Sequence, residues 1–197
     1  MSKILGNLSE GIVFVLSAPA GTGKTTLVRK LIAEFDCIAE SVSCTTRPIR
    51  PGEVPGVDYH FLTASLFEEK RKAGEFLECA EVFGYWYGTS KAFVRHQQEA
   101  GKHVFLVIDT QGAMELQRQS FPGVYIFLSP PSLEVLEERL RGRQTETHEV
   151  VQQRLAWAEE ELKKLSAYDY HIVNDRLENA YQVLRSIVIA EEHSLKH

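Results

Sequence analysis

A loop of small residues that follows an apolar strand constrains this chain more than any other feature. The run IVFVL at residues 12–16 is followed at once by SAPAGTGKTT at residues 17–26. This segment fits the phosphate-binding pattern G-x-x-x-x-G-K-[ST] at every fixed position except the first, where Ala18 replaces glycine. The pattern requires a strand before the loop and a helix after it, so a strand–loop–helix unit is expected here.

The residues of this loop suit a nucleoside triphosphate. Backbone N–H groups at a helix N-terminus attract phosphate, together with the positive end of the helix dipole. Gly21 and Gly23 permit backbone angles and a close approach that a side chain would block. Lys24 adds a charge for the β- and γ-phosphates, and Thr25 offers a hydroxyl to Mg²⁺. The first position needs mainly a small residue, so Ala18 is compatible where its φ is negative. An ordinary glycine turn is the alternative, but it does not explain why strand, helix and GKTT coincide.

Apolar strands alternate with amphipathic segments along most of the chain. Further strand-like runs occupy residues 104–108, 124–128 and 171–173. Apolar residues recur at helical spacing over residues 27–35, 133–140 and 151–165, and a final helix is expected within residues 178–197. The strands are continuously apolar, as strands buried on both faces are. The sequence therefore predicts an α/β fold of the P-loop type, with a mostly parallel sheet flanked by helices.

Residues 43–90 differ in composition from the rest. They contain the proline- and arginine-rich segment RPIRPGEVPG, a short charged helix near residues 65–73, and the aromatic pieces EFLECAEVF and YWYG. This composition predicts a small α+β lobe inserted into a core made of residues 1–42 and 91–197.

Length, composition and charge fit one soluble domain. The chain has 197 residues, of which 44% are hydrophobic and 25% charged. A formal net charge of −5 argues against the basic face that nucleic acid requires. The first residues contain no apolar stretch that suits a signal peptide or a membrane span. Three scattered cysteines do not suggest a disulfide framework, so a cytoplasmic protein without nucleic-acid or membrane partners is expected.

Arginines late in the chain are candidates for a lid. Arg139 and Arg143 are four residues apart, so a helix places them on one side, and Arg154 lies on the next predicted helix. Such a segment, residues 139–155, could close on phosphates and neutralise charge during transfer. A solvated, salt-bridged helix face is the alternative, and the phosphate loop in the same chain favours the lid.

The inserted lobe offers groups for a second phosphate. Arg47 and Arg50 lie in a segment that its prolines hold extended, and arginine pairs suit a phosphomonoester dianion. Tyr59 and Tyr87 are further donors in the same lobe. A charged surface loop is the alternative for the two arginines.

On these motifs the chain resembles the guanylate kinase family from about residue 11 to residue 189. The matching pieces are SAPAGTGKTT, SVSCTTRPIRPGEVPGVDYHF, GEFLECAEVFGYWYGTS, VIDTQGA, RLRGRQTET and HIVND. The second piece is highly specific. The resemblance implies a nucleoside monophosphate kinase that converts ATP and GMP to ADP and GDP, in purine nucleotide salvage and GTP supply. It implies ATP and GMP as small-molecule partners and Mg²⁺ as the cofactor, and it leaves open whether the protein is a monomer or a homodimer.

The resemblance also implies roles for residues, position by position. The ATP-binding residues would be Ala18, Pro19, Ala20, Gly21, Thr22, Gly23, Lys24, Thr25, Thr26, Arg143, Asn174 and Asp175. The GMP-binding residues would be Ser43, Arg47, Arg50, Tyr59, Glu78, Tyr87, Thr89 and Asp109, with Ser43, Glu78, Thr89 and Asp109 facing the base. The catalytic residues would be Lys24, Arg47, Arg139, Arg143 and Arg154. Thr25 would hold Mg²⁺, and Asp109 could also do so through water.

Three positions depart from the family pattern. Ala18 replaces the usual first glycine, Gln144 stands where the lid turn commonly has glycine, and Val107 replaces the first of two aspartates. Asp109 is therefore the only acid at that strand end.

The alternative function is a protein-binding domain of the same fold that has lost the nucleotide machinery. The presence of Lys24, Thr25 and the arginines favours the enzyme.

Overall fold

The computed structural model describes residues 3–142 and 148–195, and in this part of the chain the main sheet is entirely parallel. Its five strands lie in the order β2-β7-β1-β8-β9. They are β1 (Val13–Ser17), β2 (Ile38–Ser41), β7 (His103–Ile108), β8 (Val124–Ser129) and β9 (Tyr170–Val173). The predicted α/β class with a parallel sheet is confirmed.

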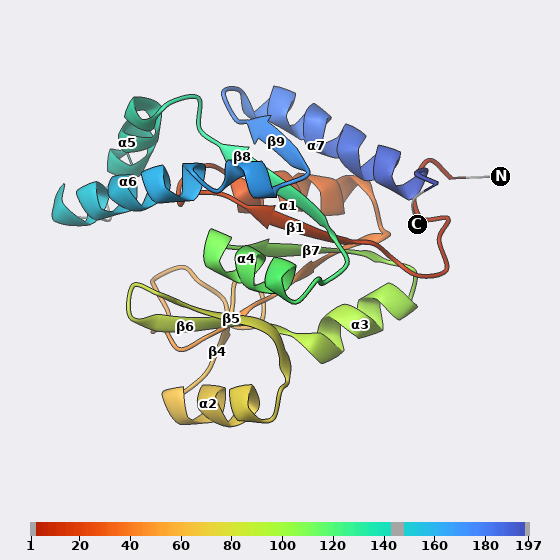
Figure 1. Ribbon diagram of the computed structural model, residues 1–197, viewed down its shortest axis with the longest axis horizontal. Helices are drawn as coiled ribbons and strands as arrows, with labels where there is room; N and C mark the ends of the chain where they lie inside the picture. Colours follow the sequence, from red (N-terminus) through yellow and green to blue (C-terminus); the bar gives the residue numbers. More distant parts are fainter. Residues whose placement is uncertain (1–2, 143–147, 196–197) are drawn as a thin grey trace.

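Helices cover both faces of this sheet (Figure 1). Helices α1 (Lys24–Glu34) and α7 (Leu177–Glu192) pack on one face, and α3 (Lys91–Glu99) and α4 (Thr110–Arg118) pack on the other. Successive side chains of β1 alternate between the two layers, since Phe14 and Leu16 join one apolar cluster and Val13 and Val15 join the other. Every residue of β1 is buried, which explains its continuously apolar sequence.

Residues 44–90 form a second, smaller sheet in the order β4-β3-β6-β5. The strands are β3 (Cys44–Thr45), β4 (His60–Phe61), β5 (Phe76–Val82) and β6 (Tyr85–Ser90), and helix α2 (Ala64–Lys72) lies beside them. Phe67 of α2 stacks on Phe76 and closes a small apolar core with Cys44. Figure 1 shows this lobe below the carboxyl ends of the main strands.

Two further helices stand next to the loop that follows β1. Helix α5 (Leu133–Arg141) packs against α6 (His148–Leu162) through Leu136, Leu140, Val151 and Ala158. The apolar pattern predicts one helix over residues 151–165, but α6 ends at Leu162 and Leu165–Ala167 form a 3-10 turn that leads the chain into β9. No helix among the described residues is long and apolar enough to cross a membrane.

Parallel strands bring their carboxyl ends to one edge of the sheet. Ser17, which ends β1, is paired with Ile108, which ends β7, so the phosphate loop and Asp109 leave the sheet side by side. Ligands of open α/β sheets bind at this edge.

Candidate active site

A cleft of about 360 Å³ lies at this edge, between the phosphate loop, the small sheet and helix α6. It brings together most of the residues that the sequence predicts for a site. These are the loop residues 18–26 together with Ser43, Arg47, Arg50, Tyr59, Glu78, Tyr87, Asp109 and Arg154. The phosphate loop and the lobe therefore face one another across a single cavity.

The phosphate loop has the backbone that its glycines permit. Gly21 has a φ of 92° and Gly23 a φ of 95°, values that residues with a side chain rarely adopt. Gly23 directly precedes Lys24, the first residue of α1. The Lys24 ammonium donates a hydrogen bond to the Ala18 carbonyl, and the Thr22 hydroxyl donates to the Pro19 carbonyl at 2.7 Å. The loop is thus folded back over the start of the helix.

Alanine at the first position of the loop is well accommodated. Among the described non-glycine residues, a positive φ occurs at Phe83 and Ser120 and not at Ala18. Ala18 is 2% exposed and belongs to the apolar cluster between the sheet and α1. Its methyl group therefore faces the core, and the condition on its φ is met.

Three predicted residues, Arg139, Asn174 and Asp175, are not among the described residues that line the cleft, and one of them bonds directly to the phosphate loop. The Asn174 amide, 4% exposed, donates to the Thr22 carbonyl at 2.6 Å. Arg139 donates to the carbonyl of Asn174 at 2.9 Å and to that of Asp175 at 3.3 Å. Asn174 thus holds one carbonyl of the phosphate loop, and Arg139 holds the backbone that carries Asn174. Arg143 and Gln144, two further positions of the predicted lid, lie outside the described residues.

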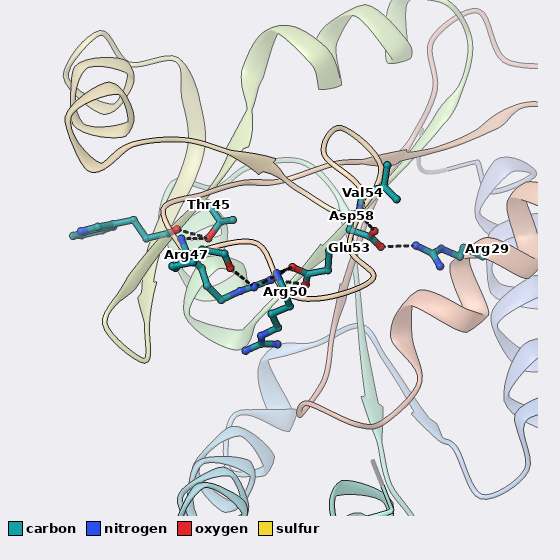
Figure 2. Close-up of polar contacts among 9 residues, drawn as sticks. Arg29, Thr45, Arg47, Arg50, Glu53, Val54 and Asp58 are labelled. Atoms are coloured by element: carbon teal, nitrogen blue, oxygen red, sulfur yellow. Dashed lines mark hydrogen bonds and ion pairs between the residues drawn. The ribbon is translucent and has the colours of Figure 1, made fainter. Parts of the chain in front are cut away.

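A buried ion pair fixes the first arginine of the lobe. Arg47 is 6% exposed, and its guanidinium donates to the two oxygens of Glu53 at 2.6 and 3.1 Å (Figure 2). The same carboxylate accepts from the Arg50 backbone N–H at 2.8 Å. Burial alone would raise the pKa of Glu53, but these donors lower it, so the pair stays ionised. Glu53 escaped the sequence analysis, although its place three residues after Arg50 was a usable signal.

Two tyrosine rings complete this side of the cleft. The Tyr59 and Tyr87 rings lie 5.8 Å apart, and the Arg47 guanidinium carbon is 5.3 Å from the centre of the Tyr59 ring. Burial raises the pKa of Tyr59, which keeps its hydroxyl protonated and able to donate. The cluster of Arg47, Tyr59 and Tyr87 can therefore supply several donors to one anion.

A buried carboxyl group occupies the other side of the lobe. Glu78 is 4% exposed and accepts a hydrogen bond from the Thr89 hydroxyl at 2.6 Å. Burial raises the pKa of Glu78 to about 7, and the charge of Asp109 acts in the same direction. Asp109 caps α4 by accepting from the Gly112 N–H at 2.9 Å. Two of the carboxyl groups that line the cleft thus belong to this side, Glu78 deeply buried and Asp109 held at a helix start.

Helix α6 contributes three lining residues, of which the sequence analysis named only Arg154. Trp157 and Glu161 also line the cleft, and their spacing from Arg154 places all three on one helix face. Glu161 is 3% exposed and accepts from the Thr110 hydroxyl at 3.4 Å. Burial raises the pKa of Glu161, and the charge of Lys24 opposes that shift.

Comparison with known proteins shows the family of this chain. The family model described as guanylate kinase matches residues 11–191. The chain belongs to the guanylate kinase family. It is 52% identical to guanylate kinase of Protochlamydia amoebophila over 96% of each chain. It is 48% identical to guanylate kinase of Chlamydia trachomatis serovar D, over 94% of this chain and 90% of that one. The crystal structure of guanylate kinase from Anaplasma phagocytophilum is 35% identical, with a TM-score of 0.78 over 94% of this chain and 88% of that one. The resemblance seen in the sequence is confirmed.

Proposed function

We propose that this protein is an enzyme that transfers the γ-phosphoryl group of ATP to GMP, giving ADP and GDP. One observation carries the proposal: a single cleft is lined by the phosphate loop, by a buried carboxyl group and by the Arg47–Tyr59–Tyr87 cluster. Membership of the guanylate kinase family supports it. The protein-binding alternative is not favoured.

The buried carboxyl group suits guanine. Guanine presents N1–H and an exocyclic amine as adjacent donors, and the Glu78 carboxylate can accept from both. The Thr89 hydroxyl already donates to Glu78, so we assign it the task of orienting that carboxylate. The hydroxyl of Ser43, which also lines the cleft, would then donate to O6 of guanine. Adenine would bring an N1 lone pair against the carboxylate, which disfavours AMP.

Alignment and charge neutralisation would provide the catalysis. The attacking atom is an oxygen of the GMP phosphate, which is already anionic near neutral pH, so no general base is required. Arg47, Tyr59 and Tyr87 would hold that phosphate, with Arg50 beside them, while the amides of the phosphate loop hold ATP. Lys24 and Arg154 would neutralise charge on the transferring group. In this proposal Arg139 acts through Asn174 on the shape of the loop, and a role for Arg143 stays a prediction.

The donor groups present fit Mg²⁺. Among the described residues, no group of three or more His, Cys, Asp or Glu side chains could hold a metal ion. The cleft instead offers the Thr25 hydroxyl and the Asp109 carboxylate, and Mg²⁺ bound with nucleotides takes most of its ligands from phosphates and water. When bound, the ion would screen the charge of the phosphates. The cytoplasmic location expected from the sequence stays a prediction.

Release of ADP in a coupled assay, with ATP and either GMP or AMP, tests this function. We expect GMP to be preferred over AMP by about 10⁴-fold in kcat/KM. Glu78→Gln should abolish most of the kcat/KM for GMP and leave ATP affinity, measured without GMP, nearly unchanged. Lys24→Ala, the control for the donor side, should lower turnover at least about 10³-fold. Normal GMP kinetics in Glu78→Gln would remove Glu78 from the site, and no ADP release with GMP would refute the activity.

A further inference from the structure

The turn between β5 and β6 holds an aromatic residue in an unfavourable conformation. Phe83 has a φ of 51° and Gly84 a φ of 78°. Two-residue hairpin turns with both φ values positive favour Asn or Gly at the first position, and a bulky residue there is unusual. The Phe83 side chain is also half exposed. The turn disfavours phenylalanine, and a half-exposed ring contributes little to the core of the lobe. We therefore look for the role of this ring in its contacts.

The Phe83 ring contacts helix α6 beside the cleft. Its centre lies 5.6 Å from that of the Trp157 ring, with the two planes at 46°. The guanidinium carbon of Arg154 lies over the Phe83 ring, 5.7 Å from its centre. All three residues line the cleft. The contact therefore joins the lobe to the face of α6 that carries the proposed catalytic arginine.

Polar contacts attach the lobe to the core elsewhere. Asp58 of the lobe pairs with Arg29 of α1 at 2.9 Å (Figure 2), and Gln111 of α4 donates to the Glu81 carbonyl at 3.1 Å. Neither of these contacts involves α6. Of these three contacts between the lobe and the core, the Phe83 contact is the one that involves Arg154.

We propose that Phe83 is a positioning residue for phosphoryl transfer, because its ring packs on Trp157 and holds the Arg154 guanidinium at the cleft. A cation over the face of an aromatic ring is attracted by the ring quadrupole. Such a contact with the ring needs no hydrogen bond from the guanidinium, so it leaves the N–H groups of Arg154 able to bind phosphate oxygens. Phe83 itself need not touch either nucleotide. This inference rests on the proposed function and adds to it a link between the acceptor lobe and the catalytic arginine.

The test uses Trp157 as a reporter. The chain has two tryptophans, so Trp86→Phe leaves Trp157 as the sole indole and serves as the parent. In this parent we compare Phe83→Asn, which removes the ring but suits the turn, with the conservative Phe83→Tyr. Leu66→Asn is the matched control, since Leu66 is an exposed apolar residue of α2 on the same lobe. Trp157 emission, thermal midpoint, kcat and both KM values are measured for each.

In Phe83→Asn we expect a red-shifted Trp157 emission and a kcat about tenfold lower. Its KM for GMP should stay within about threefold, because Glu78 and Arg47 are untouched. Its thermal midpoint should not fall, and Phe83→Tyr and Leu66→Asn should behave like the parent. If the parent is active and Phe83→Asn keeps either the parental kcat or the parental Trp157 emission, the positioning role of Phe83 is overturned. The proposed function is not affected by that result. A parent that is inactive on ATP and GMP overturns the proposed function, and this inference with it.

Discussion

Glu78 must be ionised to accept both guanine donors, yet it lies in surroundings that oppose ionisation. Its side chain is 4% exposed and burial raises its pKa to about 7, while the Thr89 hydroxyl, 2.6 Å away, partly counteracts that shift. A neutral carboxyl group has one fewer acceptor and a proton that faces the N1–H of guanine. The protein without GMP therefore holds a mixture of binding-competent and incompetent forms near pH 7.

We predict that protonation of Glu78 lowers kcat/KM for GMP about tenfold per pH unit below pH 7, in addition to the effect of titrating the GMP phosphate, because the pKa of Glu78 in the free enzyme is about 7. Above that pH the carboxylate persists and the dependence should level off. Steady-state kinetics from pH 5.5 to 8.5 measure the profile. Glu78→Gln is the control, since it retains the titration of the GMP phosphate but not that of the carboxyl group. Equal slopes in the two proteins would contradict this assignment.

Some site residues could be read from the sequence and others could not. The phosphate loop was predictable because glycines, Lys24 and the flanking strand and helix are all local in the chain. Glu78 came from the family resemblance, since a single glutamate in a strand carries no signal of its own. Glu161 and Phe83 were missed because their roles depend on which distant segments face them, namely Thr110 and helix α6.

At the scale of elements, the start of α4 shapes the base site. Asp109 caps this helix, and Gly112 stands in its first turn directly against the Glu78 carboxyl group. A Cβ atom at Gly112 would come within 2.5 Å of Glu78 Oε2. The sequence analysis named neither α4 nor the edge strand β2. Long or continuously apolar elements such as β1 and β8 were evident, whereas β2 is four residues long with two half-buried positions.

Gly112→Ala should therefore displace Glu78 without breaking the helix, because alanine favours helices more than glycine does. We expect kcat/KM for GMP to fall about 10²-fold, the usual consequence of misplacing a binding group by about an ångström. Circular dichroism should be unchanged, and so should ATP affinity measured without GMP. GMP kinetics like those of the wild type would mean that the Glu78 carboxyl group can move aside without loss of GMP binding.

At the scale of the whole molecule, the two ends of the chain lie near each other (Figure 1), and a polar cluster around Glu192 ties them together. Glu192 of α7 accepts from the Gly6 and Asn7 backbone N–H groups at 2.6 and 3.0 Å, and from the Asn7 amide at 2.7 Å. It also pairs with His103 of β7 at 2.7 Å. The Ile12 N–H donates to His103 Nδ1, so Nε2 carries the proton that faces Glu192. One carboxylate thus joins the N-terminal segment, the sheet and the last helix.

The ionised form of Glu192 should consequently stabilise the fold. Burial alone would raise its pKa, but the Gly6, His103 and Asn7 donors lower it from 4.5 to about 2. A carboxyl group with a lowered pKa in the folded state contributes stability that is fully present above pH 4.5 and is lost as the pH falls toward 2. The shift corresponds to about 3 kcal/mol of unfolding free energy at neutral pH.

Glu192→Gln removes this charge at nearly constant size, and we predict a loss of about 3 kcal/mol at pH 7. Because the wild type loses its advantage on acidification, the difference between the two proteins should shrink steadily from pH 5 to pH 2.5. Urea unfolding of both proteins at several pH values measures it. Turnover of ATP and GMP at pH 7 should change less than about twofold, since His103 begins β7 whereas the phosphate loop follows β1 at the opposite edge of the sheet. A difference that stays constant with pH would assign the stabilisation to packing around Glu192 and not to its charge.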